Sequence, residues 1–304
     1  MNGLILALLF NARPGPPPLW ATCPRYARLV FSTAGPEIGY HDLDKGTVVM
    51  LDKQGKVMRT IKLKEGDVPL WFTENELHVA IQPKITSINV KGRSTHGPVA
   101  PRFFGVSGHL FVETADVTLV DESRSISFQG FDQWAGIGID PPGKTLAYIE
   151  MPMDVAFVSA ARFVDDFWAR DPRKLTPSIE KVGPCTLLPG YRDVAVLDAG
   201  HIAFLGCFTQ WSGDSSTWQK TLQDWSPLAL SEGLPNSGKC FLFVMRLSDG
   251  LTKGYCMMDV GVSRERMGPF GGTLCLSPSG DAVYVKTTKG LVRIPRGELL
   301  TLVD

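Results

Sequence analysis

The sequence carries no surplus of charge of either sign, because 31 lysine and arginine residues are balanced by 31 aspartate and glutamate residues. It also contains no long run of like charges that would create a local excess. Proteins that hold nucleic acid through its phosphates carry a net or clustered positive charge. The balanced composition therefore predicts that nucleic acid is not a partner.

Long hydrophobic runs are also missing. The apolar stretch at residues 3–10 is far shorter than the ~20 residues that cross a bilayer. A secretory signal needs a basic start and a small-residue cleavage site, and neither Met1–Gly3 nor Pro18–Ala21 supplies them. We therefore expect no transmembrane segment, and an intracellular or organellar location in preference to secretion. Residues 3–10 are expected to form a buried strand, with a targeting remnant as the alternative.

Motifs of common active sites are absent from the chain. It contains no His-Glu-x-x-His, no Gly-x-Ser-x-Gly and no phosphate-binding glycine loop. Its 6 cysteines include no Cys-x-x-Cys pair, which argues against a zinc site. We predict no catalytic residue, no metal and no cofactor from these patterns.

Turn residues are plentiful instead. The 31 glycines and 22 prolines are spread along the chain, which suits short strands joined by turns better than long helices. A turn followed by an apolar strand recurs, and glycine, which tolerates the positive φ of a tight hairpin, occupies the same place in most copies. The copies are residues 73–80, 106–112, 141–148, 198–204 and 278–285. Each copy predicts a β-hairpin.

Further apolar segments follow these hairpins and complete four-stranded units. The clearest is Thr47–Ile61, in which Asp52–Gly55 turns between two runs rich in β-branched residues. Residues 117–120 with 125–128, and 240–244 with 254–258, form similar pairs. Four-stranded units in series predict an all-β fold, a β-propeller. Counting a first unit whose inner strand is Ala27–Phe31, we expect six blades in one domain spanning residues 1–304.

A strand that ends in Asp-x-x-Gly and leads to an outer strand, as in Leu51–Met58, resembles the blades of six-bladed propellers of the NHL and TolB-like kind. The resemblance implies a closed ring. Leu291–Ile294 and Leu299–Val303 are expected as strands of the last blade, to which residues 3–10 would add a strand. Closure would remove sheet edges that favour aggregation.

One segment breaks the pattern of short connections. Residues 208–239 lie between two predicted strands of the fifth blade and hold 3 of the 7 tryptophans, Trp211, Trp218 and Trp225, at equal spacing. A short helix is expected around 212–227, capped by Ser215 or Ser216 and stopped at Pro227. Its apolar side comprises Trp218, Leu222 and Trp225. The second and third strands of a blade are joined on the face that also carries the connections between blades, so we place the insertion there.

The tryptophans have two interpretations. Either they fold back onto the propeller and cap its channel, or they stay exposed and anchor a protein partner, since Trp is enriched among interface hot spots. Both interpretations stay open for the tryptophans. As the function we predict a non-catalytic interaction module, or an accessory or scaffold subunit of a larger complex, which binds its partner through Trp211, Trp218, Leu222 and Trp225. The sequence leaves two alternatives open. One is a metal-dependent hydrolase or lactonase with calcium at the channel mouth, held by residues such as Glu37, Asp42 and Asp154; the other is a carbohydrate binder that stacks sugars on the tryptophans.

Two other features accompany this insertion. Cys207 ends one predicted strand and Cys240 begins the next, so these residues are expected to form either a disulfide across the base of the insertion or two buried thiols. Residues 160–171 place Phe163, Val164, Phe167 and Trp168 on one helical face, which predicts a second short helix that ends before Pro172.

Overall fold

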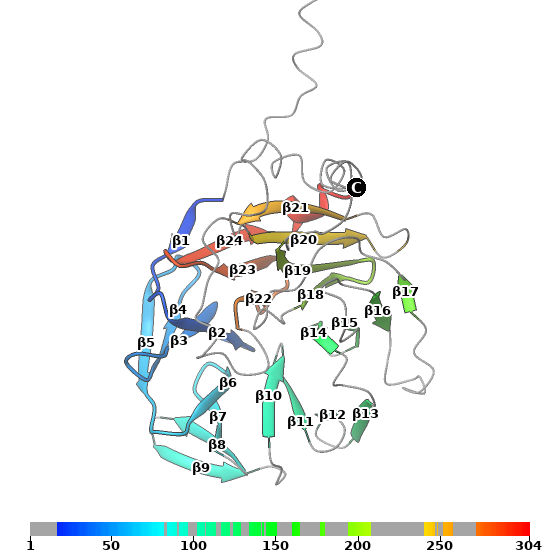
Figure 1. Ribbon diagram of the computed structural model, residues 1–304. Coiled ribbons are helices and arrows are strands. Elements are labelled where there is room, and N and C mark those ends of the chain that lie inside the picture. The colour runs from blue at the N-terminus through cyan, green and yellow to red at the C-terminus, as the bar shows by residue number, and fades with distance from the viewer. Residues whose placement is uncertain are drawn as a thin grey trace, which may run out of the picture.

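The computed structural model describes residues 17–81, 84–89, 91–96, 102–106, 108–113, 117–121, 124–128, 134–140, 142, 144–150, 160–164, 177–179, 194–207, 240–246, 248, 252–257 and 272–304. Within these ranges, 24 strands form four four-stranded sheets and one eight-stranded sheet. The eight-stranded sheet is two four-stranded units joined edge to edge. The described strands therefore make six four-stranded antiparallel units, numbered here in chain order (Figure 1).

The strands of each unit follow one another along the chain, apart from one strand of unit six. Units one to three contain β2 (Ala27–Ser32), β3 (Ile38–Asp42), β4 (Thr47–Leu51) and β5 (Val57–Lys62); β6 (Val68–Phe72), β7 (Leu77–Ile81), β8 (Lys84–Asn89) and β9 (Gly92–His96); and β10 (Arg102–Val106), β11 (His109–Glu113), β12 (Val117–Asp121) and β13 (Arg124–Phe128). Units four to six contain β14 (Trp134–Ile139), β15 (Leu146–Glu150), β16 (Ala160–Val164) and β17 (Pro177–Ile179); β18 (Val194–Asp198), β19 (His201–Cys207), β20 (Cys240–Arg246) and β21 (Thr252–Met257); and β22 (Leu274–Leu276), β23 (Ala282–Lys286), β24 (Leu291–Pro295) and β1 (Leu19–Ala21).

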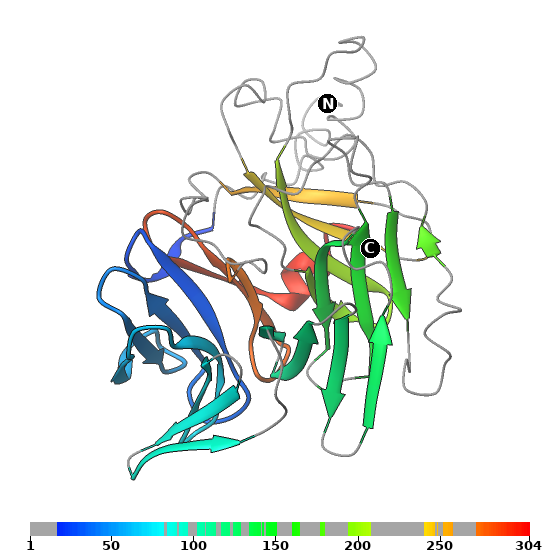
Figure 2. The ribbon, with the colours of Figure 1, turned by 60° about the horizontal axis from the view of Figure 1, so that its bottom comes forward.

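The inner strands of the units form a closed circle. β2, β6, β10, β14, β18 and β22 each contact the next in this order, and β22 contacts β2. β2 and β6 pair in parallel through Phe31 with Trp71 and Ser32 with Phe72. The Leu29 N–H donates to the Gly272 carbonyl over 2.5 Å and links units one and six. Figures 1 and 2 show the units following one another around the molecule, the arrangement of a β-propeller.

The predicted hairpins are confirmed. All five repeat copies join the first strand of a unit to its second, at β6–β7, β10–β11, β14–β15, β18–β19 and β22–β23. The turn at Asp52–Gly55 is also confirmed: Asp52 Oδ1 accepts the backbone N–H groups of Gln54 and Lys56, at 2.9 and 2.8 Å, and Gly55 has φ +77°. A short acidic side chain that binds backbone amides is a general means of making such turns.

The ring closes through a strand from the N-terminal part of the chain, β1, which the sequence did not predict. β1 pairs antiparallel with β24, Leu19 facing Val292 and Ala21 facing Leu291, and so becomes the outer strand of unit six. The strand expected at residues 3–10 lies outside the described residues. That strand stays a prediction.

Two predictions of secondary structure are wrong. Residues Leu299–Val303 are not a strand, because Arg296–Leu300 forms the helix α3 and a turn follows. Leu299 and Val303, four residues apart, are both buried, which fits the helical period. Residues 160–164 are not helical but form β16, paired with β15; residues 165–171 of that predicted helix lie outside the described residues. Pairing with a neighbouring strand overrode the local apolar spacing.

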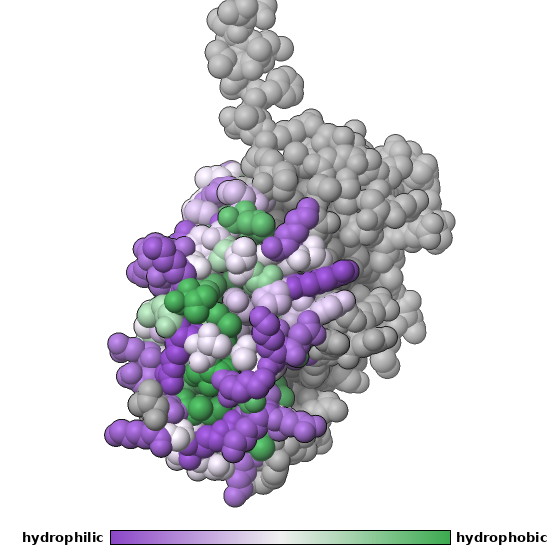
Figure 3. Space-filling model, turned by 90° about the vertical axis from the view of Figure 1, so that its left-hand side faces the viewer, coloured by the Kyte–Doolittle hydropathy of each residue, from purple (hydrophilic) through white to green (hydrophobic). Residues whose placement is uncertain are grey.

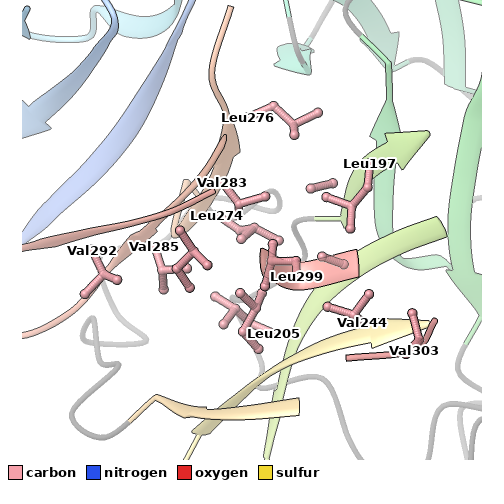
Figure 4. Packing of buried hydrophobic residues seen from close by; sticks show 14 of the residues in the cluster. Leu197, Leu205, Val244, Leu274, Leu276, Val283, Val285, Val292, Leu299 and Val303 are labelled. Atoms are coloured by element: carbon pink, nitrogen blue, oxygen red, sulfur yellow. The ribbon is translucent and has the colours of Figure 1, made fainter. Parts of the chain in front are cut away.

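The hydrophobic core lies between the faces of neighbouring units. Between units five and six, buried side chains of β18–β20 meet those of β22–β24, and Leu299 and Val303 fill the space beside them (Figure 4). Arg296 Nη1 donates to the Leu197 carbonyl over 3.1 Å and fixes the start of α3 on unit five. Similar clusters lie between units six and one and between units one and two. No helix among the described residues is long and apolar enough to span a membrane.

Candidate contact face and ring-closing seam

The connections between second and third strands share one face of the ring with the connections between units, because each unit is an antiparallel meander and β2 and β6 run parallel. We call this the contact face. Asp42, Ile81, Cys207 and Lys286 mark it, since each ends the second strand of its unit. The hairpins between first and second strands lie on the opposite face. The predicted location of the insertion thus follows from the strand order.

Four long connections begin and end on the contact face in the second half of the chain, whereas one, residues 165–176, begins and ends on the opposite face. Residues 151–159 and 208–239 join second to third strands, and residues 180–193 and 258–273 join one unit to the next. In unit one, by contrast, only residues 43–46 separate the second strand from the third. Loops carried by a rigid scaffold are frequent sites of binding. The contact face around units four to six is therefore the first candidate for a functional surface.

The insertion 208–239 begins and ends on two directly paired residues. Cys207 is the last residue of β19 and faces Cys240, the first residue of β20. Below this pair the two strands are deeply buried: residues 202–205 and 242–245 have 0% exposure. The rings of Phe204 and Phe243 lie 5.5 Å apart between their centroids. Both ends of the insertion are therefore held on a rigid ladder.

The predicted partner-binding residues Trp211, Trp218, Leu222 and Trp225 lie outside the described residues. Of the predicted site, the structure therefore describes the backbone of Cys207 and Cys240 alone. The register confirms that these two cysteines occupy facing positions on neighbouring strands. Their bonding stays a prediction.

A second group of polar residues, which the sequence gave no reason to connect, lies where units six and one meet. We call it the ring-closing seam: Glu37, Tyr284 and Arg293, with Cys23 and Lys286 nearer the contact face. The Tyr284 hydroxyl donates to Glu37 Oε1 over 2.8 Å, and Arg293 Nε donates to the Tyr284 oxygen over 3.1 Å. Trp20 of β1 packs on Tyr284 with 4.9 Å between ring centroids. Residues far apart in sequence thus bind one another across the closure.

The ionisation of Tyr284 supports this structural role. Burial raises the pKa of its phenol, and the hydrogen bond to Glu37 and the charge of Glu37 raise it further. Arg293 opposes this rise but is the weaker influence. The phenol therefore keeps its proton at neutral pH and acts as the donor to Glu37.

Lys286 is buried at the contact-face end of the seam. Its Nζ donates to the Arg25 carbonyl over 2.5 Å. Burial lowers its pKa, while Cys23 raises it and Arg25 lowers it further. Burial likewise raises the pKa of Cys23 to about 11, against the opposing effect of Lys286 and with a smaller contribution from Asp42. A thiol with that pKa is protonated at neutral pH and is a poor nucleophile.

Glu37 and Asp42, two of the three carboxylates considered for a calcium site, do not converge. Glu37 precedes β3 and Asp42 ends it, so at about 3.3 Å per residue their backbones are roughly 16 Å apart. Asp42 Oδ1 accepts the N–H groups of Asp44 and Lys45, each at 3.1 Å, and Glu37 binds Tyr284. Asp154 lies outside the described residues. In the described part of the chain, no three or more His, Cys, Asp or Glu residues form a group that could hold a metal ion.

Comparisons with known proteins leave the family open. No protein-family model matches the sequence, and no curated protein is significantly similar to it. Solved structures that resemble it include Kuenenia stuttgartiensis hydrazine synthase, at 14% identity and a TM-score of 0.47, covering 97% of this chain and 81% of that one. Kluyvelomyces marxianus Hsv2 has 8% identity and a TM-score of 0.40, covering 86% and 80%. TolB from Acinetobacter baumannii has 8% identity and a TM-score of 0.38, covering 74% and 56%. The assignment of the β-propeller fold therefore rests on the strand topology of this chain.

Proposed function

We propose that the protein is a non-catalytic interaction module, an accessory or scaffold subunit of a larger complex, and that a protein partner binds the insertion 208–239. The observation that carries the proposal is the attachment of this insertion: it leaves and re-enters the ring at the facing residues Cys207 and Cys240, above a fully buried ladder. Because both ends of the insertion are attached to buried strands, a partner can bind the insertion without disturbing the packing of the ring.

The composition of the insertion supports a protein partner. Three tryptophans in one segment could each bury on the order of 200 Å² of surface, which suits the anchor residues of an interface. A helix of two or three turns is not stable alone in water and needs a surface to pack on. In this proposal the partner supplies part of that surface.

The ring-closing seam favours a scaffold over an enzyme. Glu37, Tyr284 and Arg293 bind one another across the closure, and the Cys23 thiol is protonated at neutral pH. These ionisable groups contribute to the stability of the ring. We also infer that the complete ring has six blades, one for each described unit, in one domain. The NHL or TolB-like kind stays a prediction, which the Asp52 turn alone supports.

The test replaces Trp218 and Trp225 by alanine in the tagged full-length protein. We expect the partner found by mass spectrometry after pull-down from native lysate to be lost, while the melting temperature changes little. The matched control, Trp218→Phe with Trp225→Phe, keeps two aromatic anchors and is expected to retain much of the partner.

The opposite pattern would contradict the proposal. If the tryptophans cap the channel, the alanine variant loses stability. A loss of about 2 kcal/mol would lower the melting temperature by roughly 3 °C in a protein of this length. Elemental analysis of the purified protein tests the hydrolase alternative, since one bound divalent ion per chain would favour it. A glycan array in which Trp218 is required for a signal would favour a carbohydrate binder.

A further inference from the structure

The outer edge of β5 is open. β5 is the terminal strand of the eight-stranded sheet and pairs on one side with β4, from Thr47 facing Lys62 to Leu51 facing Val57. Among the described residues no strand pairs with its other side. Such an edge presents unpaired backbone N–H and C=O groups and is a template for a further strand.

Two apolar side chains lie exposed on this strand. Val57 is 62% exposed and Met58 is 56% exposed, whereas Ile61 on the same strand is buried. Figure 3 views the side of the molecule that carries β1 and β5, and apolar side chains form a patch there that is bordered by hydrophilic ones. β1, which Figure 1 shows on the same side as β5, carries Leu19, which is 50% exposed. Exposed apolar clusters with a polar rim are typical of binding sites.

The charge of β5 and of the residues beside it in the chain is predominantly positive. Between Asp52 and Glu65, residues 53–64 contain no acidic residue and five basic ones: Lys53, Lys56, Arg59, Lys62 and Lys64. Arg59 Nη1 donates to the Asn75 carbonyl over 3.3 Å, and Lys62 Nζ donates to the Lys45 carbonyl. Among the described residues none of the five forms an ion pair with a carboxylate. Cations without carboxylate partners on a strand edge favour an acidic ligand.

We propose that the outer edge of β5 binds an extended segment of a partner protein in which acidic and apolar residues alternate. The segment adds a strand to unit one, its apolar residues cover Val57 and Met58, and its carboxylates meet the basic side chains. A second copy of this chain does not fit, because two such edges would bring like charges together. This surface lies on unit one and is distinct from the insertion on unit five, so the proposal stands apart from the function proposed above.

Defined peptides test the proposal with the full-length protein. The probe is a fluorescein-labelled octapeptide of alternating Glu and Val, followed by fluorescence anisotropy. We expect saturable binding that weakens in 0.5 M NaCl, because salt screens surface charge. An octapeptide of alternating Lys and Val is expected not to bind, and neither is one of alternating Glu and Pro, which lacks half of the backbone donors. Equal binding of the Glu-Val and Glu-Pro peptides would overturn strand addition.

Hydrogen exchange locates the contact. In the free protein the outward amides of residues 57–62 are expected to exchange readily, and the Glu-Val peptide is expected to slow them. Slow exchange of all these amides in the free, monomeric protein would overturn the proposal, because another segment of the chain would then cover the edge. A dimer found by light scattering, with the same amides protected, would overturn it in favour of a second copy.

Variants separate charge from shape. Lys56→Gln with Arg59→Gln is expected to weaken binding of the Glu-Val peptide about fivefold, given the modest strength of surface charge pairs. Met58→Gln keeps the side-chain length and is expected to weaken it as well. Lys144→Gln, an exposed lysine on unit four, is the matched control and is expected to bind as the parent protein does. Binding that is unaffected by the β5 variants, or a labelled oligothymidylate bound as tightly as the peptide, would overturn the proposal.

Discussion

Gly108 lies in the turn between β10 and β11 and contacts a distant unit. Its φ is +83°, and a Cβ built there would lie 2.5 Å from Thr33 Cγ2 and 3.3 Å from Phe31 Cε1. Both neighbours belong to unit one, so this glycine permits units three and one to approach each other. The hairpin pattern predicts glycine at this place for its backbone alone, but the close approach could not be inferred from the sequence.

Gly108→Ala is therefore expected to destabilise the protein more than an ordinary turn substitution. The backbone strain of a non-glycine residue at positive φ costs about 1–2 kcal/mol, and the steric conflict with Thr33 adds about 1–3 kcal/mol. Gly280→Ala is the matched control, since Gly280 has φ +69° but no atom within 4 Å of the added Cβ. Denaturant unfolding measures both. Equal losses of stability in the two variants would show that the steric conflict with unit one adds nothing to the backbone strain.

His41 on β3 makes stability depend on pH. Burial lowers its pKa from 6.5 to about 4, with Arg28 adding to the decrease and Asp42 opposing it. The unfolded chain takes up a proton near pH 6.5, which the folded protein accepts only near pH 4. The free energy of unfolding is therefore expected to fall between pH 6.5 and pH 4, by on the order of 1 kcal/mol after allowance for solvent screening.

The measurement compares the free energy of unfolding of the parent protein and of His41→Gln across pH 4 to 7. The variant has no group that titrates at position 41, so the difference between the two curves isolates this histidine. We expect the parent to lose more stability than the variant as the pH falls. Parallel curves would contradict the assignment.

At the scale of elements, Cys207 and Cys240 lie at the two ends of the insertion, where a disulfide would join β19 to β20. We propose that they form a disulfide when the protein is oxidised, because they face each other across β19 and β20. The bridge would close a loop of about 34 residues, and in the chain-entropy model it would stabilise the protein by roughly 3 to 4 kcal/mol. Mass spectrometry after alkylation, with and without reductant, identifies the bond. Alkylation of both thiols in oxidised protein would show two free cysteines.

Strands and turns could be predicted where the sequence repeats. They could not be predicted where pairing with a neighbouring strand determines the secondary structure. The hairpins were found because turn residues and apolar strands recur at matching places. β3 was missed: its sequence, Ile38–Asp42, includes Gly39, His41 and Asp42, which are poor strand signals, yet it lies between β2 and β4 in the sheet. A Cβ on Gly39 would lie 2.6 Å from the Phe72 ring, so close packing explains that glycine. β16 and α3 were assigned wrongly because short apolar runs fit either period.

The candidate site was predictable to a smaller extent. The strand order confirms the face on which residues 208–239 begin and end, because an antiparallel meander fixes it once the strands are known. The ring-closing seam could not be predicted, since Glu37 and Tyr284 meet only after the ring closes. Local sequence patterns contain no information about contacts over such separations.

At the scale of the whole molecule, closure depends on β1. Trp20 packs on Tyr284 and against the cluster between units six and one, whereas Leu19 beside it is half exposed. Trp20→Ala is expected to cost about 2 kcal/mol, because it removes a partly buried ring from the seam. Leu19→Ala, the control, is expected to cost less than about 1 kcal/mol. Thermal unfolding measures the stability lost in both variants. A loss for Trp20→Ala no larger than that for Leu19→Ala would mean that β1 contributes little to closure.

The pairing of Leu19 with Val292 also sets an order of events in the cell. Units one to five can be complete while the last strands are still in the ribosome, but β1 has no partner until β24 has emerged. The circle therefore closes only after unit six has been synthesised. Until then β1 and the exposed flank of unit one are open to chaperones and to strands of other chains. Premature termination before residue 291 would leave a protein with five complete units, an incomplete sixth unit and a permanently open ring.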